Sequence, residues 1–228
     1  MNALLLSAGF GRRLSDYVKN KPKCLVKINK KTLLDYWLEI LNNKKIDKII
    51  INTHYKHKKI HDFVNNHKLK KKIILSHENK ILGSIGTILE NKEILNRYKD
   101  FFVAHSDNFT SFDLTKFLNF HYQKKNKHTV MTFDTKNYKS SGIFNFENKK
   151  IKYYQKSNTY VRGPANASIF IFNKSIFKLI YKKKKIKDIS EDLIPLITKN
   201  LNFYHNTNIM LDIGTKENLI KARNYFYK

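Results

Sequence analysis

The sequence predicts a single α/β domain in which a mixed, mostly parallel sheet is covered by helices on both faces, as a three-layer sandwich. Three observations support this prediction. Short apolar runs alternate with segments of helical spacing, the pattern of parallel strands connected by helices. A length of 228 residues suits one continuous core. No repeat or Pro/Ser-rich linker divides the chain. We therefore expect one domain over residues 1–228.

The first half of the chain alternates regularly between the two kinds of element. Apolar, β-branched runs predict buried strands at Ala3–Ser7, Lys48–Asn52, Lys72–Ser76 and Phe101–His105. Helical spacing predicts helices at Thr32–Leu41, Lys56–Asn65, Ile85–Leu95 and Leu114–Lys124. The first of these helices has Leu34, Trp37, Leu38 and Leu41 at the spacing of one apolar face.

The pattern changes after about residue 129, where short strands follow one another closely. These strands are predicted at Val130–Phe133, Gly142–Phe146, Lys152–Gln155 and Ser168–Phe172, with a turn at 147–149. Helices return at Lys174–Tyr181, Ser190–Thr198 and Lys216–Tyr225, and a last strand is predicted at Ile209–Ile213. Asp188 or Ser190 would cap the second of these helices. The second half therefore extends the sheet in a mixed or antiparallel manner.

The chain is strongly basic, with 45 Lys and Arg against 18 Asp and Glu and a formal net charge of +27. Such a charge suggests a nucleic-acid-binding module. However, only five of these residues are arginines, which usually read phosphates and guanine edges, and the lysines are scattered along the sequence. We therefore expect a lysine-coated surface and no nucleic-acid partner. The binding module stays as an alternative of a different class.

Composition also limits the location of the protein. No apolar run approaches the roughly 20 residues that cross a bilayer, so no membrane association is expected. The apolar start has no basic region before it, and we interpret it as the first strand, not as a secretory leader. The single cysteine, Cys24, excludes an internal disulfide and a cysteine-based zinc site. A reducing cytoplasm fits this composition.

A glycine-containing loop follows the first predicted strand. Gly9 and Gly11 allow a ligand to approach the backbone closely. The loop is not a Walker motif, since no Gly-Lys-Ser/Thr follows, and it lacks the third glycine of the dinucleotide fingerprint. The cations Arg12, Arg13 and Lys23 come shortly after it. A turn lined by these side chains would suit a triphosphate.

Several motifs together resemble one family. Leu-x-x-Ala-Gly-x-Gly-x-Arg-Leu from residue 5 and Lys-Pro-Lys-Cys-Leu-Val from residue 21 are similar to the amino-terminal motif of sugar-1-phosphate nucleotidyltransferases. The likeness continues through residues 32–38, 51–55, 77–87, 104–108 and 211–217, and is greatest for compact bacterial guanylyltransferases of mannose 1-phosphate or heptose 1-phosphate. This resemblance implies the Rossmann-like fold of nucleotide-diphospho-sugar transferases, with a nucleotide-binding part over about 1–127 and a sugar-phosphate-binding part over about 128–228.

Two carboxylates are candidates for a metal site. Asp107 closes the apolar run that begins at Phe101, and Asp212 closes another short apolar run. Ligands gather at the carboxyl ends of strands in open α/β sheets, and Mg²⁺ takes hard oxygen ligands and bridges to phosphate oxygens. By resemblance, both residues match the two metal-binding aspartates of the family, so we expect Mg²⁺ as the cofactor.

Nucleotide recognition is assigned to two segments. The resemblance places Ala8, Gly9, Gly11 and Arg12 at the nucleotide, and Glu78 and Gly83 in the segment that reads the base. A carboxylate accepts hydrogen bonds only, and guanine offers adjacent donors at N1 and N2. Glu78 therefore favours GTP over the other nucleotides.

The resemblance also implies how the reaction proceeds. Arg13 and Lys23 would stabilise charge on the α-phosphate and on pyrophosphate, Lys156 would orient the sugar phosphate, and Asn166 would contact a sugar hydroxyl. The products would be an NDP-sugar and pyrophosphate, for capsule, lipopolysaccharide or other glycan precursors. Gln155 and Ala167 depart from the family pattern, so a cytidylyltransferase acting on a phosphorylated alcohol or amino compound stays open. The oligomeric state, including a homo-oligomer, is also open.

Overall fold

The computed structural model describes residues 1–9, 11, 14, 21–125, 127–147, 150–155 and 161–225, with the backbone alone at residue 150. The chain divides into two compact units, and it passes between them four times. Unit 1 comprises Met1–Ile81, Ala104–Leu114 and Asn208–Lys228. Unit 2 comprises Leu82–Val103 and Thr115–Thr207. The family resemblance implies a nucleotide-binding part up to about residue 127 and a sugar-phosphate-binding part after it. That division concerns the binding of ligands, and it stays a prediction.

Unit 1 contains three parallel strands, helices packed near them, and two short antiparallel pairs of strands, which we call ribbons. Its strands are β1 (Ala3–Leu6), β2 (Lys27–Ile28), β3 (Lys31–Thr32), β4 (Ile49–Thr53), β5 (Ile73–His77), β7 (Asn108–Thr110) and β13 (Met210–Asp212). Its helices are α2 (Leu33–Leu41), α3 (His57–Asn65) and α9 (Lys216–Asn224), with the 3-10 turns η2 (Lys23–Leu25) and η3 (Lys70–Lys72). Strand β6 (Asp100–His105) begins in unit 2 and ends in unit 1.

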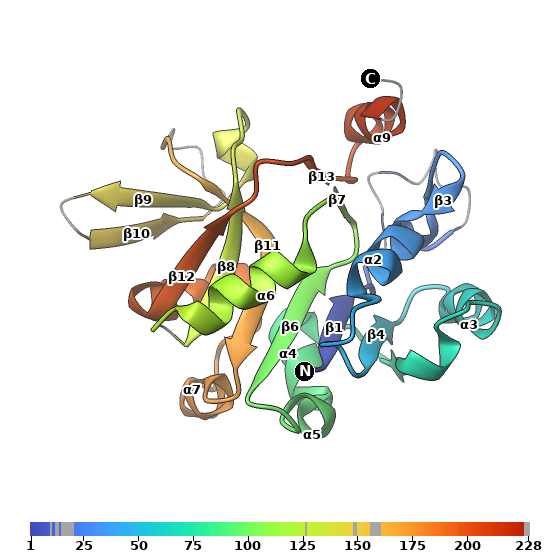
Figure 1. Ribbon diagram of the computed structural model, residues 1–228, viewed down its shortest axis with the longest axis horizontal. Helices are drawn as coiled ribbons and strands as arrows, with labels where there is room; N and C mark the ends of the chain where they lie inside the picture. The colour runs from blue at the N-terminus through green and yellow to red at the C-terminus, as the bar shows by residue number, and fades with distance from the viewer. Residues whose placement is uncertain are drawn as a thin grey trace. The chain divides into compact units, whose positions relative to one another are not determined.

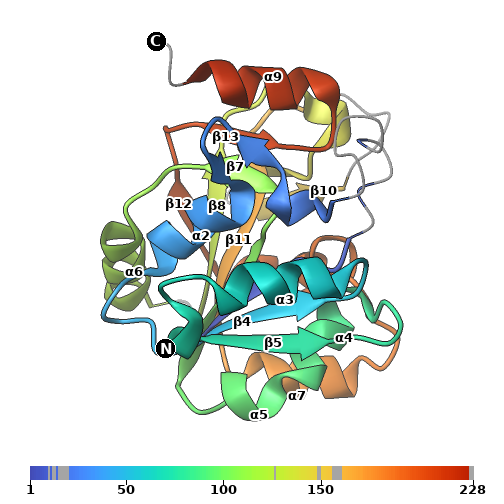
Figure 2. The ribbon, with the colours of Figure 1, turned by 90° about the vertical axis from the view of Figure 1, so that its right-hand side faces the viewer.

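Strands β1, β4 and β5 pair in parallel, with Ala3 opposite Ile49 and Ile49 opposite Ile73. Helix α3 lies across β4 and β5 (Figure 2). Every residue of β4 is buried, which explains why the sequence there is a continuous apolar run and not an alternating one. Because these strands are parallel, their carboxyl ends lie at one edge of the sheet.

Helix α2 begins with a capping box. The Thr32 hydroxyl accepts a hydrogen bond from the Asp35 N–H, and the Asp35 carboxylate accepts one from the Thr32 N–H, so two otherwise unsatisfied N–H groups are paired. The apolar face predicted from the sequence is buried. From that face, Trp37 Nε1 donates to the Asn108 carbonyl oxygen at 2.9 Å, which fixes the start of β7 against the helix.

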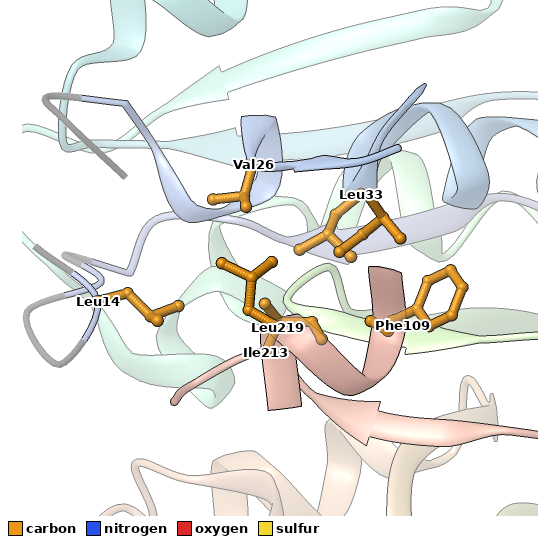
Figure 3. Packing of buried hydrophobic residues seen from close by; sticks show 8 residues of the cluster. Leu14, Val26, Leu33, Phe109, Ile213 and Leu219 are labelled. Atoms are coloured by element: carbon orange, nitrogen blue, oxygen red, sulfur yellow. The ribbon is translucent and has the colours of Figure 1, made fainter. Parts of the chain in front are cut away.

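A second apolar cluster in unit 1 lies beside the β7–β13 ribbon. Figure 3 shows its members converging from the segment after the glycine loop, the residue after η2, α2, β7, the residue after β13, and α9: Leu14, Val26, Leu33, Phe109, Ile213 and Leu219. All six side chains are buried. Helix α9 lies against β13 (Figure 2). The cluster therefore joins chain segments that are up to about 200 residues apart. The candidate site residues Lys23, Asp107 and Asp212 lie in or next to these segments.

Unit 2 contains the antiparallel extension that the sequence predicts. Its strands, besides the start of β6, are β8 (His128–Phe133), β9 (Ile143–Glu147), β10 (Lys150–Tyr154), β11 (Ala165–Asn173) and β12 (Leu201–His205). Its helices are α4 (Gly83–Glu90), α5 (Lys92–Leu95), α6 (Leu114–Gln123), α7 (Ile176–Lys182) and α8 (Ile194–Ile197), with the short turns η4 (Tyr138–Ser140), η5 (Ile189–Leu193, a π-helical turn) and η6 (Thr198–Asn200).

Strand β8 lies between β11, with which it is antiparallel, and β12, with which it is parallel (Figure 1). Strand β9 pairs with both β10 and β11. Aromatic rings fill the core of this unit, among them Phe101, which stacks on Phe177 with centroids 5.5 Å apart. The α/β class and the mixed, mostly parallel sheet are confirmed.

Three local predictions differ from the structure. The helix predicted at Ile85–Leu95 is two helices, α4 and α5, separated by Asn91, whose ψ of 15° departs from the helical value and whose side-chain amide donates to the Thr87 carbonyl at 2.9 Å. The helix predicted at Ser190–Thr198 consists of η5, α8 and η6, and Asp188 is its N-cap. The sequence did not predict β2, β3, β7 or β12. The turn at 147–149 lies mostly outside the described residues.

Two expectations from composition can be examined in the described part of the chain. None of the helices there is both long and apolar enough to cross a membrane. Cys24 is a buried free thiol, and burial raises its pKa to about 12. The thiol is therefore protonated at neutral pH and is not a nucleophile.

A buried polar network in unit 2 is centred on His128. Its Nδ1 accepts a hydrogen bond from the Asn173 N–H at 3.2 Å, and the Asn173 side chain donates to Asp100 at 2.8 Å. Burial lowers the pKa of His128 to about 4, with smaller contributions from the positive charges of His121 and Lys127, against the attraction of Asp100. The neutral ring is the form that accepts from Asn173.

This network predicts a pH-dependent stability. The unfolded chain takes up a proton at His128 near pH 6.5, but the folded chain does so only near pH 4. The free energy of unfolding should therefore fall as the pH falls through this window, by up to about 1.4 kcal/mol per pH unit from this residue. His128→Asn keeps an acceptor and should reduce the slope in urea unfolding. The exposed His61→Asn should keep the wild-type slope, and equal slopes in all three proteins would contradict the assignment.

Candidate functional site

The glycine loop follows β1 directly at the carboxyl edge of the unit 1 sheet. Gly11 has φ +64°, a left-handed conformation that favours glycine, and its carbonyl accepts a hydrogen bond from the Leu14 N–H at 3.0 Å. A Cβ at Gly9 would meet no atom of the described residues within 4 Å, so this side of the backbone leaves room for a ligand among them. A Cβ at Gly11 would lie 3.5 Å from Lys23 Cβ. The loop therefore packs beside the stem of Lys23.

The same edge carries a buried polar network. Asn52, at the end of β4, accepts a hydrogen bond from the Ser7 N–H at 2.5 Å and donates from Nδ2 to Glu78 Oε1 at 2.8 Å. The Glu78 N–H donates to the Thr53 carbonyl at 2.8 Å. The glycine loop, the end of β4 and the residue after β5 are thus held together by one amide side chain.

A pair of serines makes the corresponding link to β6. The Ser7 hydroxyl donates to the Ser106 hydroxyl at 2.8 Å, and the Ser106 hydroxyl donates to the Leu6 carbonyl at 3.0 Å. The Ser106 N–H also donates to the Leu6 carbonyl, at 3.1 Å. This arrangement places Asp107, the next residue, at the edge to which the glycine loop belongs.

Asp107 and Asp212 are brought together by the β7–β13 ribbon. In this antiparallel pair Asp212 lies opposite Asn108, and the Ile213 N–H donates to the Asp107 carbonyl at 3.0 Å. Lys23, which follows Pro22 in η2, places its Nζ 2.7 Å from Asp107 Oδ2 and 2.9 Å from Asp212 Oδ1. We call these three residues, Lys23, Asp107 and Asp212, the ion triad.

The electrostatics of the site favour the charged forms of Lys23 and Asp107. Burial would lower the pKa of Lys23, but attraction by Asp107 and Asp212 outweighs it and raises the pKa above the usual value. Burial would raise the pKa of Asp107, but the charge of Lys23, assisted by His105, holds it below its usual value. Lysine and carboxylate are therefore both ionised at neutral pH, and the pair is a charge-assisted hydrogen bond.

The donor chemistry of the ion triad fits Mg²⁺. Two carboxylate oxygens, the hard ligands that Mg²⁺ prefers, both lie within 2.9 Å of one ammonium nitrogen, so they already surround a position that a cation takes. Among the described residues, no group of three or more His, Cys, Asp and Glu side chains is placed to hold a metal. A magnesium ion here would complete its shell with phosphate oxygens and water.

Asn166, the one predicted sugar-binding residue that the structure describes, belongs to unit 2. Asn166 Nδ2 donates to the Tyr153 hydroxyl at 3.1 Å and to the Ser190 hydroxyl at 3.3 Å. Its Oδ1 accepts from the N–H of Ser168, which has φ +55°. Asn166 therefore stabilises the irregular register of β11 against β8 and orients the hydroxyls of Tyr153 and Ser190. Its contact with a sugar stays a prediction. Gln155 Nε2 donates to the Glu191 carbonyl.

Gly83 begins α4 with φ +75°, and a Cβ there would lie 2.9 Å from the Lys187 carbonyl oxygen. The structure thus explains this glycine by a close backbone approach, and its nucleotide contact stays a prediction. Arg12, Arg13 and Lys156 lie outside the described residues.

Sequence reasoning did not assign a role to Asn52, nor did it place Lys23 between the two aspartates. The signal for Asn52 was present, since it is a polar residue at the carboxyl end of a buried strand, as Asp107 is. The contact of Lys23 had no local signal, because its two partners are 84 and 189 residues away.

The fold and the site together define an α/β protein with a glycine loop and paired carboxylates at one strand edge, suited to a phosphorylated ligand. The profile described as "Nucleotidyl transferase" matches residues 2–228. The chain belongs to this family, as its motifs predicted.

Two relatives illustrate the similarity. The chain is 27% identical over 229 residues to the mannose-1-phosphate guanylyltransferase catalytic subunit beta of Dictyostelium discoideum, covering 97% of this chain and 63% of that protein. It is 25% identical over 225 residues to the D-glycero-alpha-D-manno-heptose 1-phosphate guanylyltransferase of Aneurinibacillus thermoaerophilus, covering 98% of this chain and 97% of that one. The chain spans about three-fifths of the length of the Dictyostelium protein and nearly all of the other.

Solved structures confirm the fold. A putative glucose-1-phosphate thymidylyltransferase from Bacillus anthracis has a TM-score of 0.83 at 20% identity, covering 98% of this chain and 94% of that chain. HddC from Yersinia pseudotuberculosis has a TM-score of 0.80 at 22% identity, covering 99% of both chains.

The polar network predicts a stability loss on Asn52→Ala. The substitution removes the acceptor of the buried Ser7 N–H and one donor to the Glu78 carboxylate, so we expect the free energy of unfolding to fall by roughly 2 kcal/mol. Urea unfolding measures this difference. The surface substitution Asn96→Ala should leave the stability within about 0.5 kcal/mol of wild type. An equally small effect of Asn52→Ala would contradict the role of the network.

Proposed function

We propose that this chain is a sugar-1-phosphate nucleotidyltransferase that makes a GDP-sugar and pyrophosphate from GTP and a mannose-type or heptose-type sugar 1-phosphate. The observation that carries the proposal is the convergence of Asp107 and Asp212 on one cation position beside the glycine loop, in a chain that belongs to the Nucleotidyl transferase family. The guanylyltransferase names of the relatives support the choice of substrates.

The proposed chemistry needs no protein nucleophile. An oxygen of the sugar phosphate, already an anion, attacks the α-phosphorus of GTP; a new P–O bond forms, and the bond to the β-phosphate oxygen breaks to release pyrophosphate. Lys23 and Arg13 bind the phosphates and stabilise the charge that moves to the leaving group, and Lys156 orients the sugar phosphate. Mg²⁺ held by Asp107 and Asp212 would supply a Lewis acid for the phosphates. Catalysis is then positioning and electrostatics.

Glu78 is the proposed reader of the base. Its carboxylate follows β5 at the carboxyl edge of the parallel strands, where nucleotides bind in such sheets. Asn52 donates to its Oε1 and thereby orients the group. An ionised carboxylate presents acceptors only, which complements the adjacent N1 and N2 donors of guanine.

We place the reaction in the cytoplasm, where the free thiol of Cys24 would stay reduced. The GDP-sugar would serve the synthesis of a capsule, lipopolysaccharide or another glycan. Small molecules are then the partners of this chain, and the surface lysines need no nucleic acid.

A pyrophosphate-release assay tests the proposal. The purified protein is incubated with Mg²⁺, each of the four nucleoside triphosphates and a panel of sugar 1-phosphates. Release is expected with GTP and with mannose or heptose 1-phosphate. Asp107→Asn should lower kcat by about 10²–10³-fold while the protein stays folded by circular dichroism, and Asp62→Asn, on the surface, should not. Release only with CTP would favour the cytidylyltransferase alternative, and no release with any acceptor would refute the proposal.

Glu78→Gln tests the reading of the base. The substitution keeps the size of the side chain and an acceptor for Asn52 but removes the charge and exchanges one acceptor for a donor. The value of kcat/KM for GTP should fall by about 10–100-fold, the range for a hydrogen bond to a charged group, with KM for the sugar phosphate unchanged. The exposed Glu93→Gln serves as the matched control. Unchanged GTP kinetics in the Glu78 variant would remove this residue from base recognition.

A further inference from the structure

The ammonium group of Lys23 already takes the position that a metal between Asp107 and Asp212 would need. Its Nζ lies 2.7 Å from Asp107 Oδ2 and 2.9 Å from Asp212 Oδ1. These are hydrogen-bond distances, so one oxygen of each carboxylate is engaged by the lysine. A divalent ion bound to the same two oxygens would lie next to a like charge and be repelled by it.

The lysine is the member of the ion triad that is free to change its position. The main chain on both sides of the two aspartates is tied together by the Ile213 N–H, which donates to the Asp107 carbonyl at 3.0 Å, and by the β7–β13 pairing. Lys23 reaches them from a different segment through a flexible four-carbon stem. The side chain of Lys23 is only 11% exposed, whereas Asp212 is 49% exposed, so the carboxylate side of the triad faces solvent.

The glycine loop provides a reason for the lysine to move. A Cβ on Gly11 would lie 3.5 Å from Lys23 Cβ, so a phosphate held by this loop would lie beside the lysine stem. The lysine and its two carboxylates together carry one negative charge. A triphosphate would give the lysine new anionic partners. Once the lysine has moved, the two carboxylates and the triphosphate carry an excess of negative charge, which favours the binding of a divalent cation.

We propose that Lys23 is a built-in cation that fills the position between Asp107 and Asp212 in the nucleotide-free protein, and that a nucleoside triphosphate draws it away, so that metal and nucleotide bind together. The inference rests on the proposed function for the identity of the anion. The coupling is reciprocal: the nucleotide raises the affinity for the metal by the factor by which the metal raises the affinity for the nucleotide.

A Mn²⁺ titration of the nucleotide-free protein, followed by the electron paramagnetic resonance signal of free Mn²⁺, tests the proposal. Lys23→Met keeps an unbranched apolar side chain, one atom shorter, and removes the charge. It should bind Mn²⁺ about ten-fold or more tightly than wild type, within the range of coupled sites. Lys31→Met removes the same charge from an exposed ion pair with Glu39 and should bind Mn²⁺ as wild type does. Equal affinities in all three proteins would overturn the proposal.

A second comparison holds even if Lys23→Met does not fold. Nucleotide-free wild type and Asp107→Asn should bind Mn²⁺ equally weakly, because the lysine covers the carboxylates in wild type. Tighter binding by wild type than by Asp107→Asn would show that the carboxylates are open to metal while Lys23 is in place, and would overturn the inference. Neither titration contains a sugar phosphate or measures turnover. A failure of the transferase assay is therefore distinguishable from a failure of this inference.

Discussion

Two carboxylates on one short ribbon repel each other, and a cation between them removes that cost. At a separation of about 4 Å and an effective dielectric of about 20, each pair of unit charges interacts by about 4 kcal/mol. Lys23 turns this repulsion into two attractions, at 2.7 Å to Asp107 and 2.9 Å to Asp212. The cation comes from η2, and its two partners lie 84 and 189 residues further along the chain.

The apolar cluster beside the ribbon makes the ion triad possible. Val26 follows η2, Phe109 lies in β7, and Ile213 follows β13, and all three are buried in the same cluster. Each is within three residues of a member of the triad, so hydrophobic burial positions charged groups that would not otherwise approach. The loss of one charged member would leave its partners uncompensated, which costs more than the pair contributes.

The parts of the fold that the sequence predicts are those with local causes. Continuous apolar runs predicted β1, β4, β5 and β6 to within one residue at each end, and the position of Asp107 near a strand end followed from them. Strand β12 was missed because Leu201–His205 mixes polar and aromatic residues, and it is a strand only through its pairing with β8. Strand β7 (Asn108–Thr110) is likewise too short to be seen before it is paired, whereas its partner β13 lies within the strand predicted at Ile209–Ile213. Contacts such as that of Lys23 depend entirely on such pairings.

Burial distinguishes one cation, Lys23, from the other described basic residues that contribute to the high net charge. Among the lysines and arginines that the structure describes, Lys23 is the one whose residue is buried. Exposed lysines act on a triphosphate through solvent and are screened over roughly 8 Å at physiological salt, so they attract anions without selecting among them. A lysine held by two carboxylates can exchange those partners for phosphates, and its charge is then used at one defined place. In the proposed mechanism, the chemistry of the site therefore depends on where one cation is buried and not on the charge of +27.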